Sequence, residues 1–173
     1  MKIEEIIRKE HSKQQALKLF RFVIRDEKNL KDYMQILINN EPLLAQRAAW
    51  ILSEIAQKKP KSLSLFIPDL LQLLDKPTHP SITRNICKAF MFLEFEDQIA
   101  GKIYQKCFEI VQNSNQSIAA RAYSMSVLYR LCLIHPDLSR ELKILLKEVQ
   151  KEGNPACMAR SRLILLALKK AGI

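Results

Sequence analysis

The feature that most constrains the fold of this chain is an arginine that recurs at nearly equal intervals. Arg47, Arg84, Arg121 and Arg160 are separated by 37, 37 and 39 residues, and each is followed by residues that favour helices. A polar residue stands six positions before each arginine: Glu41, Thr78, Asn115 and Asn154. A period of this length is typical of repeat proteins in which each repeat is a pair of helices.

The segments between the arginine-containing helices repeat as well. Shifting residues 138–149 back by 38 positions, and then by a further 37, places apolar positions on apolar positions. The three aligned sets are Leu138, Leu142, Leu145, Leu146 and Val149; Ala100, Tyr104, Cys107, Phe108 and Val111; and Leu63, Ile67, Leu70, Leu71 and Leu74. Matching apolar faces in successive helical hairpins are buried when one hairpin stacks on the next.

Prolines and capping residues indicate where helices begin. Pro42 and Pro155 occupy first-turn positions, and Ser12 with Gln15 forms a capping-box pattern. Apolar spacing predicts helices over about 2–10, 12–26, 30–39, 42–57, 63–74, 82–94, 100–112, 118–134, 138–150 and 156–171. In the helix at 12–26 the expected inward stripe is Ala16, Leu17, Phe20, Val23 and Ile24. No convincing run alternates with a period of two, so no sheet is predicted.

The sequence therefore predicts an all-α chain that forms one domain over residues 1–173, a length that fits a single domain. Residues 11–40 are expected as a divergent first hairpin. Further hairpins are expected at 41–76, 78–113 and 115–152, and a terminal helix at 154–173. The expected fold is an α-solenoid of about four helical hairpins plus a terminal helix.

This pattern resembles the HEAT repeat family, an armadillo-like class whose helical hairpins stack into an α-solenoid. The resemblance lies in the first helix of each pair, where a polar residue and five further residues precede the arginine, as in Asn-Gln-Ser-Ile-Ala-Ala-Arg-Ala at 115–122. It covers about residues 41–171. In the family the polar position is usually Asp, which forms a ladder with Arg, whereas this chain has Glu, Thr or Asn there. We expect Arg47, Arg84 and Arg121 to be partly buried at hairpin junctions and bonded to neighbouring carbonyls or caps.

The same resemblance implies a function in binding other proteins, because HEAT-like arrays are mostly protein-binding scaffolds. The sequence contains no catalytic signature, so we expect a non-enzymatic scaffold or adaptor with an unidentified protein partner. The alternative is a nucleic-acid-binding protein, since some HEAT-like proteins are DNA glycosylases of the alkylpurine type that hold bases against aromatic residues. Trp50, the only tryptophan, either takes that role or packs between hairpins.

The chain has an excess of positive charge, with a net charge of +10. Four basic residues of the helix at 138–150 and its end share one face, opposite the apolar stripe: Arg140, Lys143, Lys147 and Lys151. Such a strip suits an acidic peptide or a phosphate backbone, and these four are the expected partner-binding residues. The competing interpretation is a solvated face, because glutamates flank the strip.

The chain shows no pattern that predicts a metal or a cofactor site. The four cysteines include no Cys-x-x-Cys pair, and the three histidines are not near enough in sequence to complete a cluster of ligands on one turn, so the cysteines are expected as core thiols. The longest fully apolar run, Leu163–Leu168, has six residues, far fewer than the ~20 that cross a bilayer. The N-terminus has no secretory signal pattern, so the default expectation is a cytoplasmic protein.

The terminal helix at 156–171 is apolar on every side along Leu163–Leu168. Such a helix is expected to be buried on every side, whereas the preceding hairpin covers only part of it. We expect an exposed patch at Leu165 and Leu168 that pairs with a second copy, giving a homodimer, or with another partner. The alternative is that residues 138–152 cover the helix sufficiently.

Overall fold

The computed structural model describes residues 3–9, 12–39, 41–76 and 79–173. Within these ranges the chain forms α-helices and short 3₁₀ helices, and no strand. The prediction of an all-α fold is therefore confirmed for this part of the chain. The polar repeat position at Thr78 lies outside the described residues.

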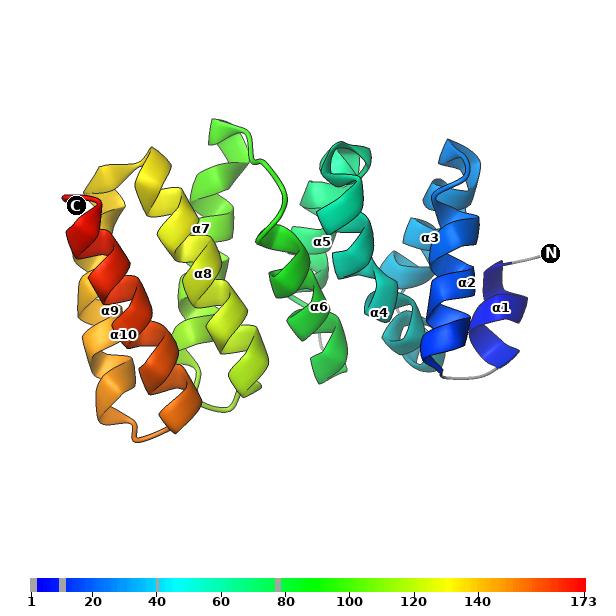
Figure 1. Ribbon diagram of the computed structural model, residues 1–173. Helices are drawn as coiled ribbons and strands as arrows, with labels where there is room; N and C mark the ends of the chain where they lie inside the picture. The colour runs from blue at the N-terminus through cyan, green and yellow to red at the C-terminus, as the bar shows by residue number, and fades with distance from the viewer. Residues whose placement is uncertain (1–2, 10–11, 40, 77–78) are drawn as a thin grey trace. The chain divides into compact units, whose positions relative to one another are not determined.

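The helices fall into two compact units, residues 1–94 (unit 1) and residues 95–173 (unit 2). Unit 1 contains α1 (Ile3–Lys9), α2 (Lys13–Val23), α3 (Glu27–Asn39), α4 (Pro42–Lys58), the 3₁₀ helix η1 (Pro60–Phe66), α5 (Ile67–Leu73) and α6 (Pro80–Phe90), as labelled in Figure 1. Unit 2 contains α7 (Asp97–Gln112), α8 (Ile118–Ile134), the 3₁₀ helix η2 (Pro136–Leu138), α9 (Ser139–Lys151) and α10 (Pro155–Lys170).

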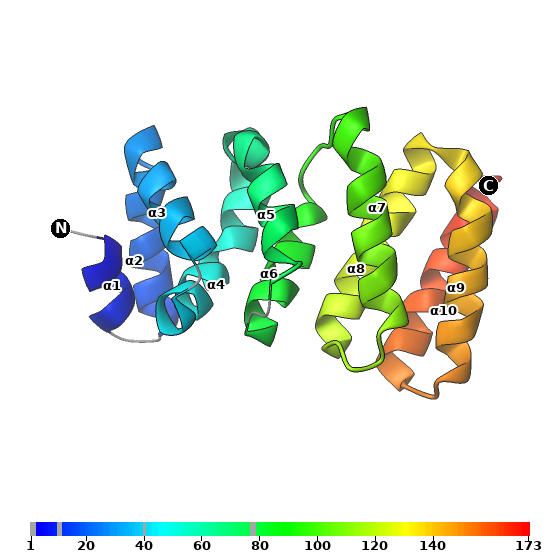
Figure 2. The ribbon, with the colours of Figure 1, turned by 180° about the vertical axis from the view of Figure 1, so that it is seen from behind.

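Unit 1 has two layers of helices. α2, α4 and α6 line one side (Figure 1), and α3 and α5 line the other (Figure 2). α4 contacts α2 and α6 in its own layer and α3 in the other, so it is the central element of the unit. The Tyr33 hydroxyl of α3 donates to the Ala48 carbonyl of α4 at 2.9 Å, which satisfies a fully buried polar group. Burial raises the pKa of Tyr33 above its usual range.

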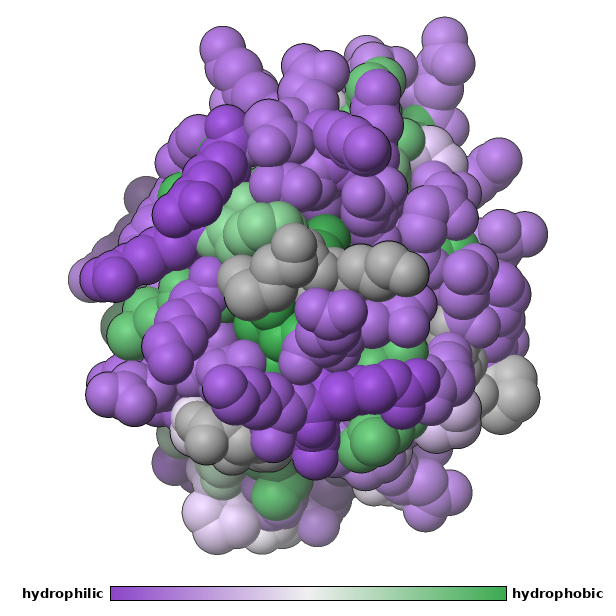
Figure 3. Space-filling model, turned by 90° about the vertical axis from the view of Figure 1, so that its right-hand side faces the viewer, coloured by the Kyte–Doolittle hydropathy of each residue, from purple (hydrophilic) through white to green (hydrophobic). Residues whose placement is uncertain are grey.

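α1 packs against α2, α3 and α4. Ile3, Ile6 and Ile7 are buried in this contact, and the charged residues at positions 4, 5, 8 and 9 are exposed. Figure 3 views the molecule from this side and shows a mostly hydrophilic surface with small hydrophobic patches. The short amphipathic helix therefore packs its apolar face on the core and turns its polar face outward.

Unit 2 also has two layers, with α8 and α10 on one side (Figure 1) and α7 and α9 on the other (Figure 2). α8 contacts α7, α9 and α10. Met125 and Leu128 of α8, Ile103 of α7 and Leu146 of α9 are fully buried, so the core lies between the two layers. Most apolar side chains of α7 and α9 are buried in this shared core, which explains why their positions repeat in the sequence.

The boundary between the units falls between Glu94 and Phe95, inside the predicted hairpin at 78–113. The first helix of that hairpin, α6, belongs to unit 1, and the second, α7, belongs to unit 2. The prediction of one domain over residues 1–173, built from hairpins at 11–40, 41–76, 78–113 and 115–152 with a terminal helix at 154–173, stays a prediction.

Local signals place several helix starts as the sequence predicts. Pro42 and Pro155 lie in the first turns of α4 and α10. The Ser12 hydroxyl accepts from the backbone N–H of Gln15 at 3.1 Å and caps α2. The side-chain amide of Gln15 donates to the Ile6 carbonyl of α1, so Gln15 joins α2 to α1.

One predicted helix is divided in the structure. Apolar spacing predicts a single helix over 63–74, but the segment consists of η1 and then α5. Pro68 explains the difference, because its nitrogen has no proton to donate to a preceding carbonyl and its ring is tolerated only in the first turn of an α-helix. α5 accordingly begins at Ile67, with Pro68 in its first turn.

Candidate functional site

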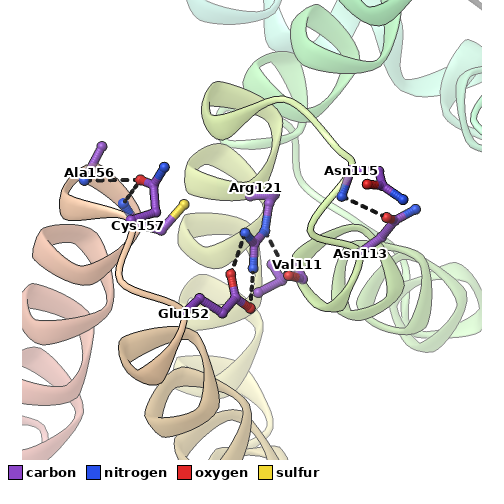
Figure 4. Close-up of polar contacts among 8 residues, drawn as sticks. Val111, Asn113, Asn115, Arg121, Glu152, Ala156 and Cys157 are labelled. Atoms are coloured by element: carbon purple, nitrogen blue, oxygen red, sulfur yellow. Dashed lines mark hydrogen bonds and ion pairs between the residues drawn. The ribbon is translucent and has the colours of Figure 1, made fainter.

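The repeat arginine of α8, Arg121, joins three helices of unit 2 (Figure 4). Its side chain is 4% exposed, and its Nε donates to the Val111 carbonyl in the last turn of α7 at 2.9 Å. Its terminal nitrogens form a bidentate ion pair with Glu152, the C-cap of α9, at 2.7 and 2.6 Å. The hydrogen bond to Glu152 is the main reason why the pKa of Arg121 is raised. A buried charge is thus paired, and a carbonyl at a helix end is satisfied.

Glu152 is the residue of this junction that sequence reasoning missed. It lies 31 residues from Arg121, and in the sequence it is only one of the glutamates beside the basic strip. The sequence feature closest to Glu152 that indicates a helix junction is Asn154, the N-cap of α10 two residues later. The Asn154 side-chain oxygen caps α10 by accepting from the backbone N–H groups of Ala156 and Cys157, both at 3.1 Å, which orders the connection between α9 and α10.

In unit 1, Arg47 of α4 bonds to the end of α1. The side chain is half-buried, and one terminal nitrogen donates to the carbonyls of Ile7 and Arg8, both at 3.0 Å. Both carbonyls lie in the last turn of α1, where backbone acceptors lack helical partners and the helix dipole favours a cation. Glu41, the polar residue of the same repeat, pairs with Arg8 at 3.1 Å.

The remaining repeat arginines have different surroundings. Arg84 of α6 is exposed and Arg160 of α10 is half-buried, and neither has a hydrogen-bond or ion-pair partner among the described residues. Arg47 and Arg121 therefore have carbonyl partners of the expected kind, whereas Arg84 has none within the part of the chain that the structure describes. The repeat fixes the position of the arginine on its own helix, whereas the group that the guanidinium binds depends on which helix end lies nearby.

A groove of about 220 Å³ lies between α2 and α4 on unit 1. It is lined by Lys13, Ala16, Leu17 and Phe20 of α2 and by Trp50, Ile51, Glu54 and Lys58 of α4. The spacing of these residues places each set on one face of its helix. Apolar walls with a few charged groups are typical of binding clefts, and a volume below roughly 300 Å³ suits one or two side chains rather than a drug-sized ligand.

Trp50 and Leu17 are the exposed apolar residues of this groove, with 37% and 43% of their surfaces accessible, whereas Phe20 is 7% exposed. The expected inward stripe of α2 is wrong for Leu17, because the helix buries Leu19 instead. Trp50 also lines a small cavity of about 20 Å³ together with Arg47 and residues of α1 and α2. The indole therefore packs between helices with part of its surface and presents the rest in the groove.

Charged side chains surround the apolar part of the groove. The Lys58 ammonium lies 4.7 Å from the centre of the Phe20 ring, a cation–π contact, and 3.7 Å from the Glu54 carboxylate. Lys13, in the first turn of α2, has no ion pair with any described residue. Glu54 is the single acidic residue among the described lining residues, so the groove favours an apolar group that carries negative charge beside it.

The basic strip of α9 is less uniform than its sequence predicts. Arg140, Lys147 and Lys151 are exposed, but Lys151 pairs with Glu148 at 2.7 Å. Lys143 is half-buried near Cys132 of α8: burial raises the pKa of this thiol to about 11, and the Lys143 charge partly offsets the effect. Ile144, 58% exposed, also lies on the outward side of α9.

The patch expected on α10 requires a correction. Leu168 is fully buried and Leu165 is half-buried, so Leu168 is not available to a second copy of the chain. The exposed leucines are Leu163, at 62%, and Leu166, at 51%. The reason is that α10 buries the stripe through Cys157, Ser161, Ile164 and Leu168, which leaves the opposite side outward.

The described residues contain no group of three or more His, Cys, Asp or Glu side chains placed to hold a metal ion. All four cysteines are free thiols and buried. None of the helices in the described ranges has the length and apolar character that crossing a membrane requires.

A family model described as HEAT repeat domain matches residues 3–168 of the chain. The match extends over both units and includes the groove helices and the four repeat arginines. No curated protein and no solved structure matches the chain significantly.

Proposed function

Because the chain belongs to the HEAT repeat domain family, we propose that it is a non-enzymatic module that binds other proteins as a scaffold or adaptor. Repeats of this family often take protein-interaction roles and are generally not enzymes. The observation that carries the proposal is the groove between α2 and α4, in which Trp50 and Leu17 are exposed above Phe20. Tryptophan in a partly desolvated cleft is typical of interaction hot spots.

The groove favours a linear peptide segment as its ligand. Its size fits one or two apolar side chains. Lys13 and Lys58 lie at the edge of the apolar surface, where their ammonium groups pair with carboxylates of the bound segment. An apolar anchor followed or preceded by acidic residues is therefore the proposed partner chemistry.

Selection of a random peptide library against the full chain tests this proposal. The selected peptides should contain an apolar residue beside acidic ones, and W50A should weaken their binding by about tenfold or more, since a buried aromatic contact is lost. The matched control is L65A, which removes an 84% exposed leucine from η1, outside the groove. Peptides that bind W50A and the unsubstituted chain equally well would remove the groove from the proposal.

Nucleic-acid binding is a second candidate function, and one observation favours it. Glu54 lines the same groove as Trp50, so the groove combines an aromatic ring and a carboxylate, the pairing that a glycosylase of the alkylpurine type would need. Under this candidate, the chain is retained on duplex DNA at physiological salt and released steeply above it. It also releases alkylated purines, and E54Q abolishes that release. Lack of retention on DNA excludes this candidate.

The basic strip of α9 is proposed as an additional contact for the protein partner. Arg140 and Lys147 are exposed and have no ion pair among the described residues, so they are available to carboxylates. Charge reversal at Arg140, Lys143 and Lys147 should abolish partner capture while the far-UV circular dichroism stays unchanged. Capture that survives the reversal identifies the strip as a solvated face.

We also propose a cytoplasmic location, which fractionation of the source cells tests.

A further inference from the structure

The outward face of α10 combines exposed leucines with cations. Leu163 and Leu166 are 62% and 51% exposed. Ala159 lies one turn before Leu163 on the same face, and Arg162, Lys169 and Lys170 are exposed near the two leucines. This face is therefore an apolar strip with Arg162 and Lys169 along one margin and Lys170 at its C-terminal end, on the side of α10 away from the buried stripe that ends at Leu168.

The positive charge of this face is not balanced from within unit 2. α10 contains no acidic residue. Of the three glutamates in α9 and its C-cap, Glu148 pairs with Lys151 and Glu152 with Arg121, at 2.7 and 2.6 Å, and Glu141 has no ion pair with a cation of α10. Arg162, Lys169 and Lys170 have no ion pair with any described residue.

α1 of the same chain has a solvated outer face and serves as a comparison for α10. Its buried isoleucines face the core, and its outer side has acidic side chains in the first turn and basic side chains in the last, so the surface there is mostly hydrophilic (Figure 3). α10 has cations only, and leucines stand where α1 has charged residues. Solubility alone explains the face of α1, but it does not explain exposed leucines between cations of one sign.

We propose that the outward face of α10 is a docking surface for an acidic amphipathic helix of another protein. Leu163 and Leu166 receive the apolar stripe of that helix, and Arg162, Lys169 and Lys170 pair with carboxylates on its flanks. Laying an amphipathic helix against an apolar strip with complementary charged margins is a recurrent mode of peptide recognition. The surface is separate from the α2–α4 groove and does not depend on the function proposed for that groove.

Charge complementarity also distinguishes this occupant from a second copy of the chain. Two α10 faces packed on each other across a two-fold axis would place the same cations on both sides of the interface. Like charges in close opposition disfavour such a pair. An acidic helix instead neutralises all three cations while it covers both leucines.

The test uses the full chain and two dye-labelled synthetic peptides of about five helical turns. One peptide has leucines on one face and glutamates on both flanks, and the other has glutamines in place of the glutamates. Fluorescence anisotropy should show at least about tenfold tighter binding of the glutamate peptide, and L163Q/L166Q and R162E/K169E/K170E should each weaken that binding by about tenfold or more. The matched controls are L65Q and K28E/K31E/K61E, which change an exposed leucine and three exposed lysines of unit 1 and should leave binding unchanged.

Several results would overturn the proposal. Equal binding of the two peptides removes the role of charge, and unchanged binding by L163Q/L166Q removes the apolar strip. A dimer in light scattering that L163Q/L166Q dissociates would assign the face to a second copy. Binding to phosphatidylserine vesicles or duplex DNA that R162E/K169E/K170E abolishes, without peptide binding, would assign it to those ligands instead. W50A should bind the glutamate peptide as tightly as the unsubstituted chain does. The test of the α10 face is therefore independent of the function proposed for the α2–α4 groove.

Discussion

Arg121 in unit 2 and Arg84 in unit 1 occupy the same position of the repeat, but their surroundings are opposite. The Arg121 side chain is 4% exposed and holds both oxygens of Glu152 and the Val111 carbonyl. Arg84 is exposed, and within the described residues it has no such partner. Arg47 is intermediate, since it is half-buried and bonds only to carbonyls of α1.

The difference indicates that the contribution of a repeat arginine to stability depends on the groups that it binds and not on its place in the repeat. A buried guanidinium whose charge is paired leaves a buried carboxylate and a free carbonyl behind when it is removed. An exposed guanidinium leaves only water-accessible groups behind. The substitutions below should therefore rank by burial and pairing, although the sequence pattern treats the arginines alike.

The largest effect is expected for R121A. Removing a nearly buried partner of a bidentate ion pair should lower the free energy of unfolding by about 2–4 kcal/mol, below the full cost of a completely buried pair because Glu152 is 30% exposed. Urea denaturation followed by far-UV circular dichroism measures it. R121K should recover only part of the loss, since lysine lacks the planar fork that binds both carboxylate oxygens. An R121A midpoint equal to that of the unsubstituted chain would contradict the structural role.

The same variant also tests the prediction of a single domain. Trp50 is the only tryptophan and lies in unit 1, so its emission follows the unfolding of that unit, whereas circular dichroism follows both units. If residues 1–173 unfold as one domain, R121A should shift both transitions equally. A shift in the circular dichroism transition alone would show that the two units unfold separately.

An intermediate effect is expected for E152Q. Glutamine keeps a hydrogen-bond acceptor near Arg121 but removes the negative charge, so a loss of about 1–2 kcal/mol is expected. A double-mutant cycle with R121A and E152A should give a coupling of roughly 1–2 kcal/mol, because the two side chains contact each other directly. Additive effects would mean that the ion pair itself contributes little.

A smaller loss, about 1 kcal/mol, is expected for R47A, because its hydrogen bonds to Ile7 and Arg8 are charge-assisted but partly solvated. The transition monitored by Trp50 emission should report it, since Arg47 and Trp50 line the same small cavity. E41Q is the matched control: its ion pair with Arg8 is about half exposed on both sides, so little change is expected. A larger loss for E41Q than for R47A would mean that the ion pair between Arg8 and Glu41 stabilises this junction more than Arg47 does.

The smallest effect is expected for R84A, within about 0.5 kcal/mol of the unsubstituted chain, as for most exposed substitutions. The same urea denaturation measures it. A loss as large as that of R121A would mean that Arg84 has a buried partner in solution and that the two repeat positions are equivalent after all.

Sequence reasoning identified one half of the α2–α4 groove and missed the other. Trp50 is a candidate from the sequence because it is the only tryptophan, whereas apolar spacing predicts Leu17 on the inward stripe of α2 and the structure exposes it. Two apolar stripes are compatible with the spacing in α2: one through Leu17, Phe20 and Ile24, and one through Ala16, Leu19, Phe20 and Val23. Which leucine is buried depends on the direction from which α1 and α4 approach, and α2 does not encode this direction by itself.

The patch on α10 was predicted at Leu165 and Leu168, but Leu168 is buried, Leu165 is half-buried, and the exposed leucines are Leu163 and Leu166. The six apolar residues of 163–168 contain no polar residue to mark the outward side. The marks lie just outside the run, since Arg162 and Lys169 are exposed and Ser161 is buried. Read together with these neighbours, the pattern places Leu163 and Leu166 outward.

The sequence by itself determined the features that depend on residues a few positions apart: the all-α fold, the family, the starts of α4 and α10 at prolines, and the repeat of arginines. Capping, proline geometry and helical periodicity act over one or two turns, so they are encoded locally. Only the tertiary structure decided which arginine is buried, that Glu152 completes the Arg121 junction, and that Trp50 and Leu17 share a groove. These outcomes depend on helix ends and faces brought together from distant positions, and burial and charge pairing act on that proximity rather than on spacing along the chain.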